Sequence, residues 1–179
     1  FMPYREKTFK PRPVQNAPEL SGNPSKLILD GQQRLTSLYQ AFFGVGESRY
    51  FIDLQKLIDG EDLEEAVFYR HHARTGQFRE LRQQADRLVL PLGIIFGSHG
   101  GFDAWLDEVM DLRPEDGDEQ KELKKRIRAA YEANIKTIET YRFPVVELGE
   151  QTPLEAVCSI FETLNLTGVR LTVFELLAA

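Results

Sequence analysis

The residues of this chain whose types and spacing favour chemistry lie in one short run, Asp30-Gly31-Gln32-Gln33-Arg34-Leu35-Thr36-Ser37-Leu38. An apolar stretch precedes the run and an amphipathic pattern follows it, which predicts a strand that turns into the N-terminus of a helix. The unpaired backbone amides and the positive end of the helix dipole attract anions at such a turn, and glycine lets the backbone approach closely. The run is therefore a candidate phosphate-binding turn.

Polar side chains of the run match the roles that phosphate chemistry requires. Arg34 carries a permanent, forked positive charge, Asp30 can position a metal ion or a water molecule, and Gln33 can orient that water. Asp30, Gln33 and Arg34 are therefore the candidate catalytic residues. The candidate phosphate-binding residues of the run are Gly31, Gln32, Arg34, Thr36 and Ser37.

The same run also has a purely structural interpretation. Asp30 at the N-cap with Gln33 three residues later has the spacing of a capping box, and Gly31 then only makes the turn. On spacing alone the two interpretations are equally good. The structural one predicts that Arg34 is held in internal salt bridges and that no pocket opens at the turn.

Composition and charge limit the possible classes of protein. The chain has 179 residues, which suffice for one domain or one domain with an appended subdomain, and 42% of them are hydrophobic, as in soluble globular proteins. A formal net charge of −6 argues against a self-sufficient nucleic-acid binder. The single cysteine, Cys158, excludes an internal disulfide and a cysteine-based zinc site. Its apolar helical surroundings predict a buried side chain.

The sequence predicts no metal centre, no membrane contact and a cytoplasmic location, because it has no signal peptide and no apolar run of 18 residues. Five of the nine prolines lie within residues 1–25, which predicts an extended N-terminal arm. Residues 26–179 are expected to form one domain. The start at Phe1 and the helix pattern from Thr172, which stops after two turns, predict that this domain is cut from a longer polypeptide at both ends.

Hydrophobic periodicity predicts the elements that position the run. Strands are expected at residues 26–30, 49–53, 66–70 and 142–148. Helices are expected at 35–43, 54–65 (a short helix or turn), 77–86, 102–112, about 115–141, 153–165 and from 172. The helical portion thus covers about 101–141, and the fold class is α+β. Trp105 is expected in the core, and Leu154, Val157, Phe161 and Leu164 are expected to face inward.

Two motifs resemble those of one known family. The stretch Leu27 to Leu38 resembles the aliphatic strand and DGQQRLTTL signature of the GmrSD-type family (domain of unknown function 262), with Ser37 in place of threonine. The stretch Phe161 to Thr172 resembles the family's FExLNxTGxxLT motif and adds Asn165 and Gly168 as candidate nucleotide-binding residues, although capping of a helix end is the alternative for both. A family motif of the form IPxYQRxYxW has no clear match in residues 1–25.

The resemblance implies a fold similar to the ParB and sulfiredoxin group, with a small mixed sheet and a helical subdomain. It implies binding of a nucleoside triphosphate with Mg²⁺, with hydrolysis left open. Family members are often N-terminal parts of modification-dependent restriction or phage-defence proteins that sense modified DNA and carry a C-terminal HNH-type nuclease domain. We therefore expect a nucleotide-binding regulatory or sensor domain that reaches DNA through the full-length protein. A non-catalytic DNA- or protein-binding module of the same system is the alternative.

The remaining candidates favour structural interpretations. His71, His72 and His99 are expected on the surface or in loops, and they lack the neighbours of an HNH site, so this chain is not expected to cut DNA by itself. The basic run Lys121 to Arg128 is expected to be the solvated face of a long helix, paired with Glu119 and Glu122.

Overall fold

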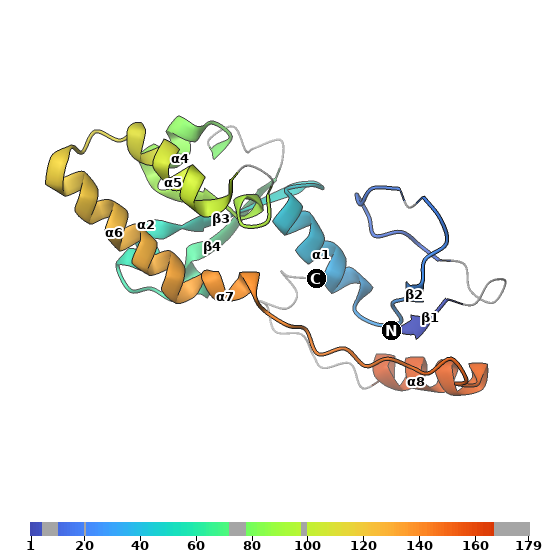
Figure 1. The fold of residues 1–179 in the computed structure, drawn as a ribbon. Coiled ribbons are helices and arrows are strands. Elements are labelled where there is room, and N and C mark those ends of the chain that lie inside the picture. Colours follow the sequence, from blue (N-terminus) through green and yellow to red (C-terminus); the bar gives the residue numbers. More distant parts are fainter. Residues whose placement is uncertain (5–10, 20, 72–77, 98–99, 167–179) are drawn as a thin grey trace. The chain divides into compact units, whose positions relative to one another are not determined.

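The computed structural model describes residues 1–4, 11–19, 21–71, 78–97 and 100–166. Contacts divide the chain into two compact units. The first comprises Phe1–Tyr39 with Phe143–Ala179, and the second comprises Gln40–Arg142. Residues 1–25 therefore belong to the same unit as the C-terminal part of the chain, and each unit is described by itself (Figure 1).

The strands of the first unit are short. Strand β1 (Met2–Pro3) pairs antiparallel with β2 (Lys26–Leu27), and the side chain of Lys26 forms a 2.6 Å ion pair with Glu147. The predicted buried strand over 26–30 is wrong in extent, because only its first two residues pair. Pro3 has no N–H to offer, so β1 cannot extend as a regular ladder partner.

The predicted strand at 142–148 is also wrong. This segment is extended but is not a strand, and its contacts with Phe1 consist of two backbone hydrogen bonds, Phe1 N to Val146 O at 2.8 Å and Leu148 N to Phe1 O at 2.9 Å. Pro144 lacks a backbone donor, which interrupts any longer ladder at this point. A continuous hydrophobic pattern therefore marks an extended segment here without a sheet.

Helix α1 (Gln32–Phe43) confirms the predicted helix after the Asp30 run, and the boundary between the two units falls inside it. Most of its predicted apolar stripe is half-buried, but Phe43 is 56% exposed and Ala41 is the buried residue of the helix. Phe42 packs edge-on against Phe96, with ring centroids 4.7 Å apart. The helix therefore forms as predicted, while its burial differs from the stripe.

Helix α8 (Leu154–Leu166) confirms the predicted C-terminal helix but begins one residue later than expected, because the Val157 amide donates to the Pro153 carbonyl at 3.1 Å. Val157 is buried as predicted. Leu154 and Cys158 are exposed, so the predictions of an inward Leu154 and a buried Cys158 are wrong. This helix is apolar on more than one face, and periodicity alone could not decide which face is covered.

A three-stranded antiparallel sheet forms the centre of the second unit. Strand β3 (Ser48–Asp53) lies between β4 (Val67–His71) and β5 (Val89–Pro91), in the order β4-β3-β5. The strands predicted at 49–53 and 66–70 are thereby confirmed, and so is the mixed α+β class. The described sheets are small and antiparallel.

The two faces of this sheet have different surroundings. Successive side chains of a strand point to opposite faces, so Ile52 shares one face with its cross-strand partners Val67 and Leu90. Ile52 and Leu90 are fully buried in the core. The opposite face carries Phe51 with its partner Phe68, and Asp53 with its partner Val89.

Helices surround the sheet in the second unit. They are α2 (Leu54–Ile58), α3 (Leu63–Ala66), α4 (Leu81–Arg87), the 3-10 turn η2 (Leu92–Ile94), α5 (Gly101–Asp111), α6 (Gly117–Asn134) and α7 (Lys136–Glu139). Helix α2 packs on α6, and α4 packs on α5 (Figure 1). The single helix predicted over 115–141 is two helices, because the chain breaks at the fully buried Ile135.

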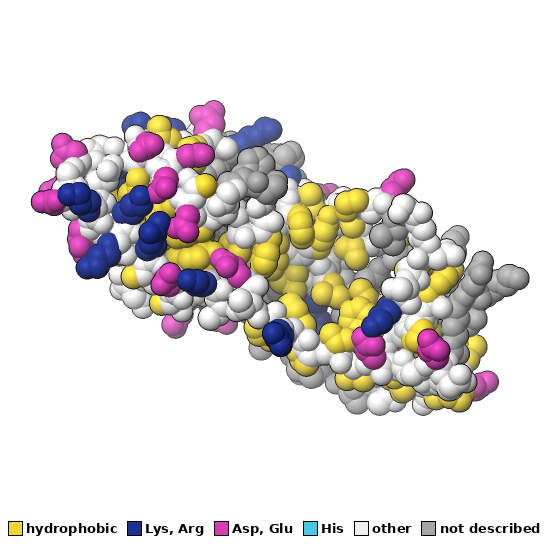
Figure 2. Space-filling view, in the orientation of Figure 1, with side chains coloured by type: hydrophobic (Ala, Val, Ile, Leu, Met, Phe, Trp, Pro, Cys, Tyr) yellow, Lys and Arg dark blue, Asp and Glu magenta, His cyan; other side chains and the backbone are white. Residues whose placement is uncertain are grey.

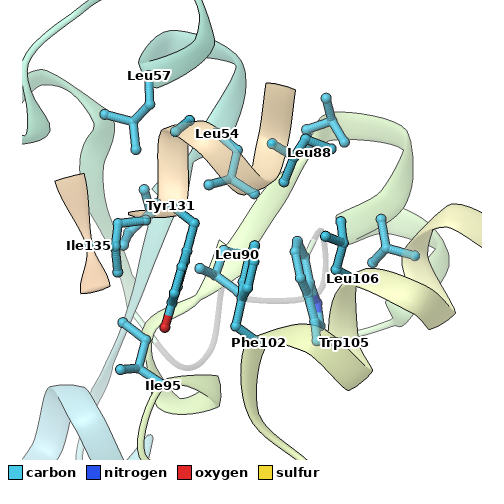
Figure 3. Packing of buried hydrophobic residues seen from close by; sticks show 14 of the residues in the cluster. Leu54, Leu57, Leu88, Leu90, Ile95, Phe102, Trp105, Leu106, Tyr131 and Ile135 are labelled. Carbon is cyan, nitrogen blue, oxygen red and sulfur yellow. The ribbon is translucent and has the colours of Figure 1, made fainter. Parts of the chain in front are cut away.

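Aromatic stacking organises the core of the second unit. Figure 3 shows Phe102 between Tyr131 and Trp105. The rings of Phe102 and Tyr131 are stacked with centroids 3.6 Å apart and an interplanar angle of 9°. Trp105 is 4% exposed, which confirms its predicted core position, and Leu106 is fully buried beside it. Burial of each such large side chain contributes about 1.5–3 kcal/mol to folding.

The basic run on α6 is a solvated face, as predicted, but its main partners differ from those expected. Lys124 pairs with Asp107 at 2.5 Å and Arg128 pairs with Asp103 at 2.7 Å, both across to α5. Figure 2 shows basic and acidic side chains interspersed over the surface of these helices. These cations therefore link two helices.

Candidate functional site

The candidate turn lies at the start of α1. Gly31 has φ +84°, a left-handed conformation that favours glycine, and its carbonyl accepts the first helical hydrogen bond from Leu35 N at 2.9 Å. Gly31 therefore occupies the N-cap position and Gln32 begins the helix. The capping box of the structural interpretation is shifted by one residue, because Gln33 is the second helical residue and Asp30 precedes the cap.

Arg34 folds back over this turn. Its Nη2 donates to Asp30 Oδ2 at 3.1 Å, and the two side chains are 54% and 51% exposed. A Cβ added at Gly31 would lie 3.8 Å from Arg34 Nη2 and 3.9 Å from its Nε. One helical turn thus brings together a carboxylate, a glycine with a left-handed backbone and a guanidinium, and the ion pair that the structural interpretation expects for Arg34 is present.

The other candidate residues of the run follow along α1. Gln32 and Gln33 have exposed side chains next to the turn. Thr36 Oγ1 donates to the Gln32 carbonyl at 2.8 Å, so its proton is used inside the helix. Ser37 is half-buried further along the helix.

The second motif lies at the end of α8. Asn165 is in the last turn of this helix, in the same unit as the turn at Gly31. Its side chain and Gly168 lie outside the described residues. Asp30 and Arg34 are therefore candidates that the structure joins through their side chains.

A cavity in the second unit was missed by sequence reasoning. It has a volume of about 580 Å³ and lies over the sheet face that carries Phe51 and Asp53. Its apolar lining comes from Phe68, Phe78, Leu88 and Val89, its cations are Lys56, Arg70, Arg87 and Arg113, and its acids are Asp53, Glu65 and Asp86. The signal available in the sequence was that β3 and β4 have large apolar side chains on both faces, which is typical of strands covered on both sides.

The rings of Phe68 and Phe78 line the cavity, and Phe51 packs against both of them. Phe51 stacks on Phe68 with centroids 5.5 Å apart, and Phe78 contacts both rings at 5.4 and 5.6 Å. Leu88 lies at the edge with φ +51°, an uncommon backbone conformation for leucine, and its carbonyl accepts a 2.9 Å hydrogen bond from Leu54 N. Strained positions of this kind cluster at functional sites.

Ion pairs shape the charge around the cavity. Arg113 pairs with Glu115 and donates through Nη1 to the Ala85 carbonyl at 2.8 Å. The hydrogen bond from Arg113 is the main reason that the pKa of Glu115 falls to about 2, and the same bond raises the pKa of Arg113. Asp53 caps α2 by accepting hydrogen bonds from the amides of Gln55 and Lys56 at 3.1 and 3.3 Å.

Within the described ranges, no three His, Cys, Asp or Glu side chains are grouped as ligands for a metal ion. His71 is exposed at the end of β4, whereas His72 and His99 lie outside the described residues. In the same described part of the chain, no helix is both long enough and apolar enough to cross a membrane.

The fold and the turn define a small α+β domain that presents a glycine-led helix start with an arginine folded over it. Residues 10–179 match the family described as GmrSD restriction endonuclease, N-terminal domain, and the chain belongs to this family. The uncharacterized protein MJ0686 of Methanocaldococcus jannaschii is 26% identical over 187 residues, which cover 93% of this chain and 30% of that protein. The chain thus spans less than a third of that relative. No solved structure matches, so the likeness to the ParB and sulfiredoxin group stays a prediction.

Proposed function

We propose that this chain is a nucleotide-binding regulatory or sensor domain of a modification-dependent restriction or phage-defence protein. Family membership supplies the restriction system as the context. The observation that supports nucleotide binding is the position of the Arg34 guanidinium, which lies over the left-handed turn at Gly31 where α1 begins.

A phosphate at this turn would replace the Asp30 carboxylate as the hydrogen-bond partner of Arg34. The pair is half exposed and spaced i,i+4, so it contributes only about 0.3–0.5 kcal/mol. A hydrogen bond between arginine and a charged phosphate is stronger, about 1.5–3 kcal/mol, and the first amides of α1 at Gln32 and Gln33 would add neutral donors. Exchange of the carboxylate for the phosphate is therefore favourable.

The same exchange would leave Asp30 free to hold the Mg²⁺ that accompanies a polyphosphate, since carboxylate oxygens suit this ion. Gln33, exposed beside the turn, would orient a water for hydrolysis. Thr36, Ser37, Asn165 and Gly168 are proposed as further contacts to the nucleotide. In the full-length protein, we propose that a C-terminal HNH-type nuclease domain cuts the DNA.

Calorimetry with GTP, CTP, UTP and ATP plus Mg²⁺ tests this function. We expect Arg34→Ala to weaken binding at least about tenfold, which corresponds to the loss of about 1.4 kcal/mol. Arg126→Ala is the matched control, because it removes one exposed cation from α6, far along the chain from the turn. Equal heats from the wild type and Arg34→Ala, or no heat from either, would contradict a phosphate site at the turn.

Release of inorganic phosphate separates hydrolysis from binding alone. Binding of a nucleotide without turnover by the full chain would make the domain a nucleotide-binding regulator without hydrolysis. Absence of nucleotide binding would favour the alternative of a non-catalytic DNA- or protein-binding module. Gel shifts with modified and plain DNA would then show whether that module binds DNA, and the binding should weaken with salt.

A further inference from the structure

We propose that the cavity over the sheet face that carries Phe51 and Asp53 binds one nucleotide whose base carries an exocyclic amino group. Arg87 would meet the phosphate, the phenylalanine floor would support the base, and Glu65 would accept a hydrogen bond from the amino group. This site lies in a different compact unit from the turn at Gly31 and does not depend on the function proposed for that turn.

The topology of the sheet places Glu65 and Arg87 at opposite edges of the cavity. Strands β4 and β5 both run antiparallel to β3, so both begin at the end of the sheet where Asp53 lies. Glu65 stands two residues before β4, and Arg87 stands two residues before β5. Neighbouring strands are about 4.8 Å apart, which separates the two backbones by roughly 10 Å. Glu65 and Arg87 thus lie on either side of β3, the central strand of the sheet.

Two cations at the rim have no carboxylate partner within the described part of the chain. The side chain of Arg87 is exposed and makes no hydrogen bond or ion pair with described residues. Arg70 donates to the neighbouring Tyr69 carbonyl at 2.9 Å, and its guanidinium lies 4.9 Å from the centre of the Phe68 ring. These two guanidiniums are therefore available to an anionic ligand.

The acidic residues that line the cavity differ in whether their carboxylates already have partners. Asp53 is bound by the amides that it caps, and Asp86 forms a 3.2 Å ion pair with Arg82. Glu65 is exposed, and its carboxylate makes no hydrogen bond or ion pair with described residues. A ligand with an anion at one end and a hydrogen-bond donor at the other therefore fits these charges better than a simple anion.

The apolar residues of the cavity favour a ligand that also has a flat apolar group. Phe78 is half-buried, and together with Phe68 and Val89 it forms one wall between the charged edges. Inorganic phosphate would leave this wall unused, and an acidic peptide would not offer a ring of matching shape. A nucleotide combines a phosphate, a flat base that stacks on aromatic and arginine side chains, and, in cytosine, adenine and guanine, an amino donor.

Titration of the full chain with dCMP, dTMP and inorganic phosphate, followed by calorimetry, tests this site. We expect dCMP to bind at least about tenfold more tightly than dTMP, since a charged acceptor for an amino group discriminates between bases. Arg87→Ala should weaken dCMP binding about tenfold and Arg87→Lys should restore part of it. Glu65→Gln should remove the preference for dCMP over dTMP.

Control variants separate this site from the turn at Gly31. Arg126→Ala matches the charge change on another exposed helix and should leave dCMP binding unchanged, whereas Arg34→Ala tests whether dCMP binds at the turn instead. Short single strands of dC and dT distinguish the source of the nucleotide: much tighter binding of the dC strand than of dCMP indicates nucleic acid, whereas equal affinity indicates a free nucleotide. Thermal unfolding verifies that each variant is folded.

Several outcomes would overturn the assignment. Unchanged dCMP binding in Arg87→Ala, or no binding of any nucleotide to the wild type, would show that the cavity is not a nucleotide site. Loss of dCMP binding in Arg34→Ala would show that dCMP binds at the turn at Gly31 instead of in the cavity. Binding of an acidic peptide that depends on Arg87, with no nucleotide binding, would make the cavity a peptide site.

Discussion

Trp105 and Gln84 form a buried hydrogen bond in which the indole Nε1 donates to Gln84 Oε1 at 2.8 Å. The amide nitrogen of Gln84 in turn donates to the Phe78 carbonyl at 3.0 Å. Gln84 is only 8% exposed, so both ends of its amide are satisfied inside the protein. This bridge connects the aromatic core to the wall of the cavity.

Replacement of Gln84 should therefore cost stability. In Gln84→Leu the indole N–H stays buried without an acceptor and the Phe78 carbonyl loses its donor, so we expect the free energy of unfolding to fall by about 1–3 kcal/mol. Urea unfolding followed by tryptophan fluorescence measures this loss. Gln83→Leu is the control, because Gln83 Oε1 is buried without a partner among the described residues and its removal should be neutral or stabilising. Equal losses in the two variants would contradict a structural role for the bridge.

Gly31→Ala should destabilise the start of α1. Alanine in the left-handed region costs about 1–2 kcal/mol, and the new Cβ would have only ordinary contacts with Arg34, so the backbone is the cause. Chemical denaturation measures the change. Gly22→Ala is the control in the same unit, since a Cβ there meets nothing within 4 Å. If Gly31→Ala were no less stable than Gly22→Ala, the left-handed turn would not be required.

The ion pair of Glu115 with Arg113 should make stability depend on pH in the acid range. The pKa of Glu115 is about 2 in the folded protein and 4.5 as an ordinary value, so its contribution is complete above about pH 4.5 and disappears as the pH falls toward 2. We expect Glu115→Gln to lose about 1 kcal/mol near neutral pH and much less near pH 2. Urea titrations at both values measure the difference, and Glu119→Gln, on an exposed helix start, should show no such pattern.

Cys158 should react with a maleimide in the native protein. Its side chain is exposed on α8, so the thiol needs no unfolding to reach the reagent. We expect one label per chain without denaturant, at a rate close to that measured in urea, by mass spectrometry. Protection of the thiol until the protein unfolds would show that this face of α8 is covered.

Local patterns predicted the elements whose residues contact each other nearby in the chain. The helix after the Asp30 run and the core position of Trp105 followed from periodicity, because each depends on which side of a helix is apolar. The strands at 49–53 and 66–70 followed from short runs of apolar and aromatic residues. Where a segment was apolar on several sides, as in α8, periodicity failed. The segment 142–148 failed because a strand also needs a partner, and its pairing with Phe1 ends after two hydrogen bonds.

The sequence by itself determined the family motifs, a helix that begins at the Asp30 run and the presence of Arg34 one turn after Asp30, since these depend on residues within a few positions of one another. Only the tertiary structure decided that Glu65 and Arg87, 22 positions apart by their numbers, line one cavity. The physical reason is that strand order and register bring distant residues together, and neither can be derived from the spacing of residues along the chain.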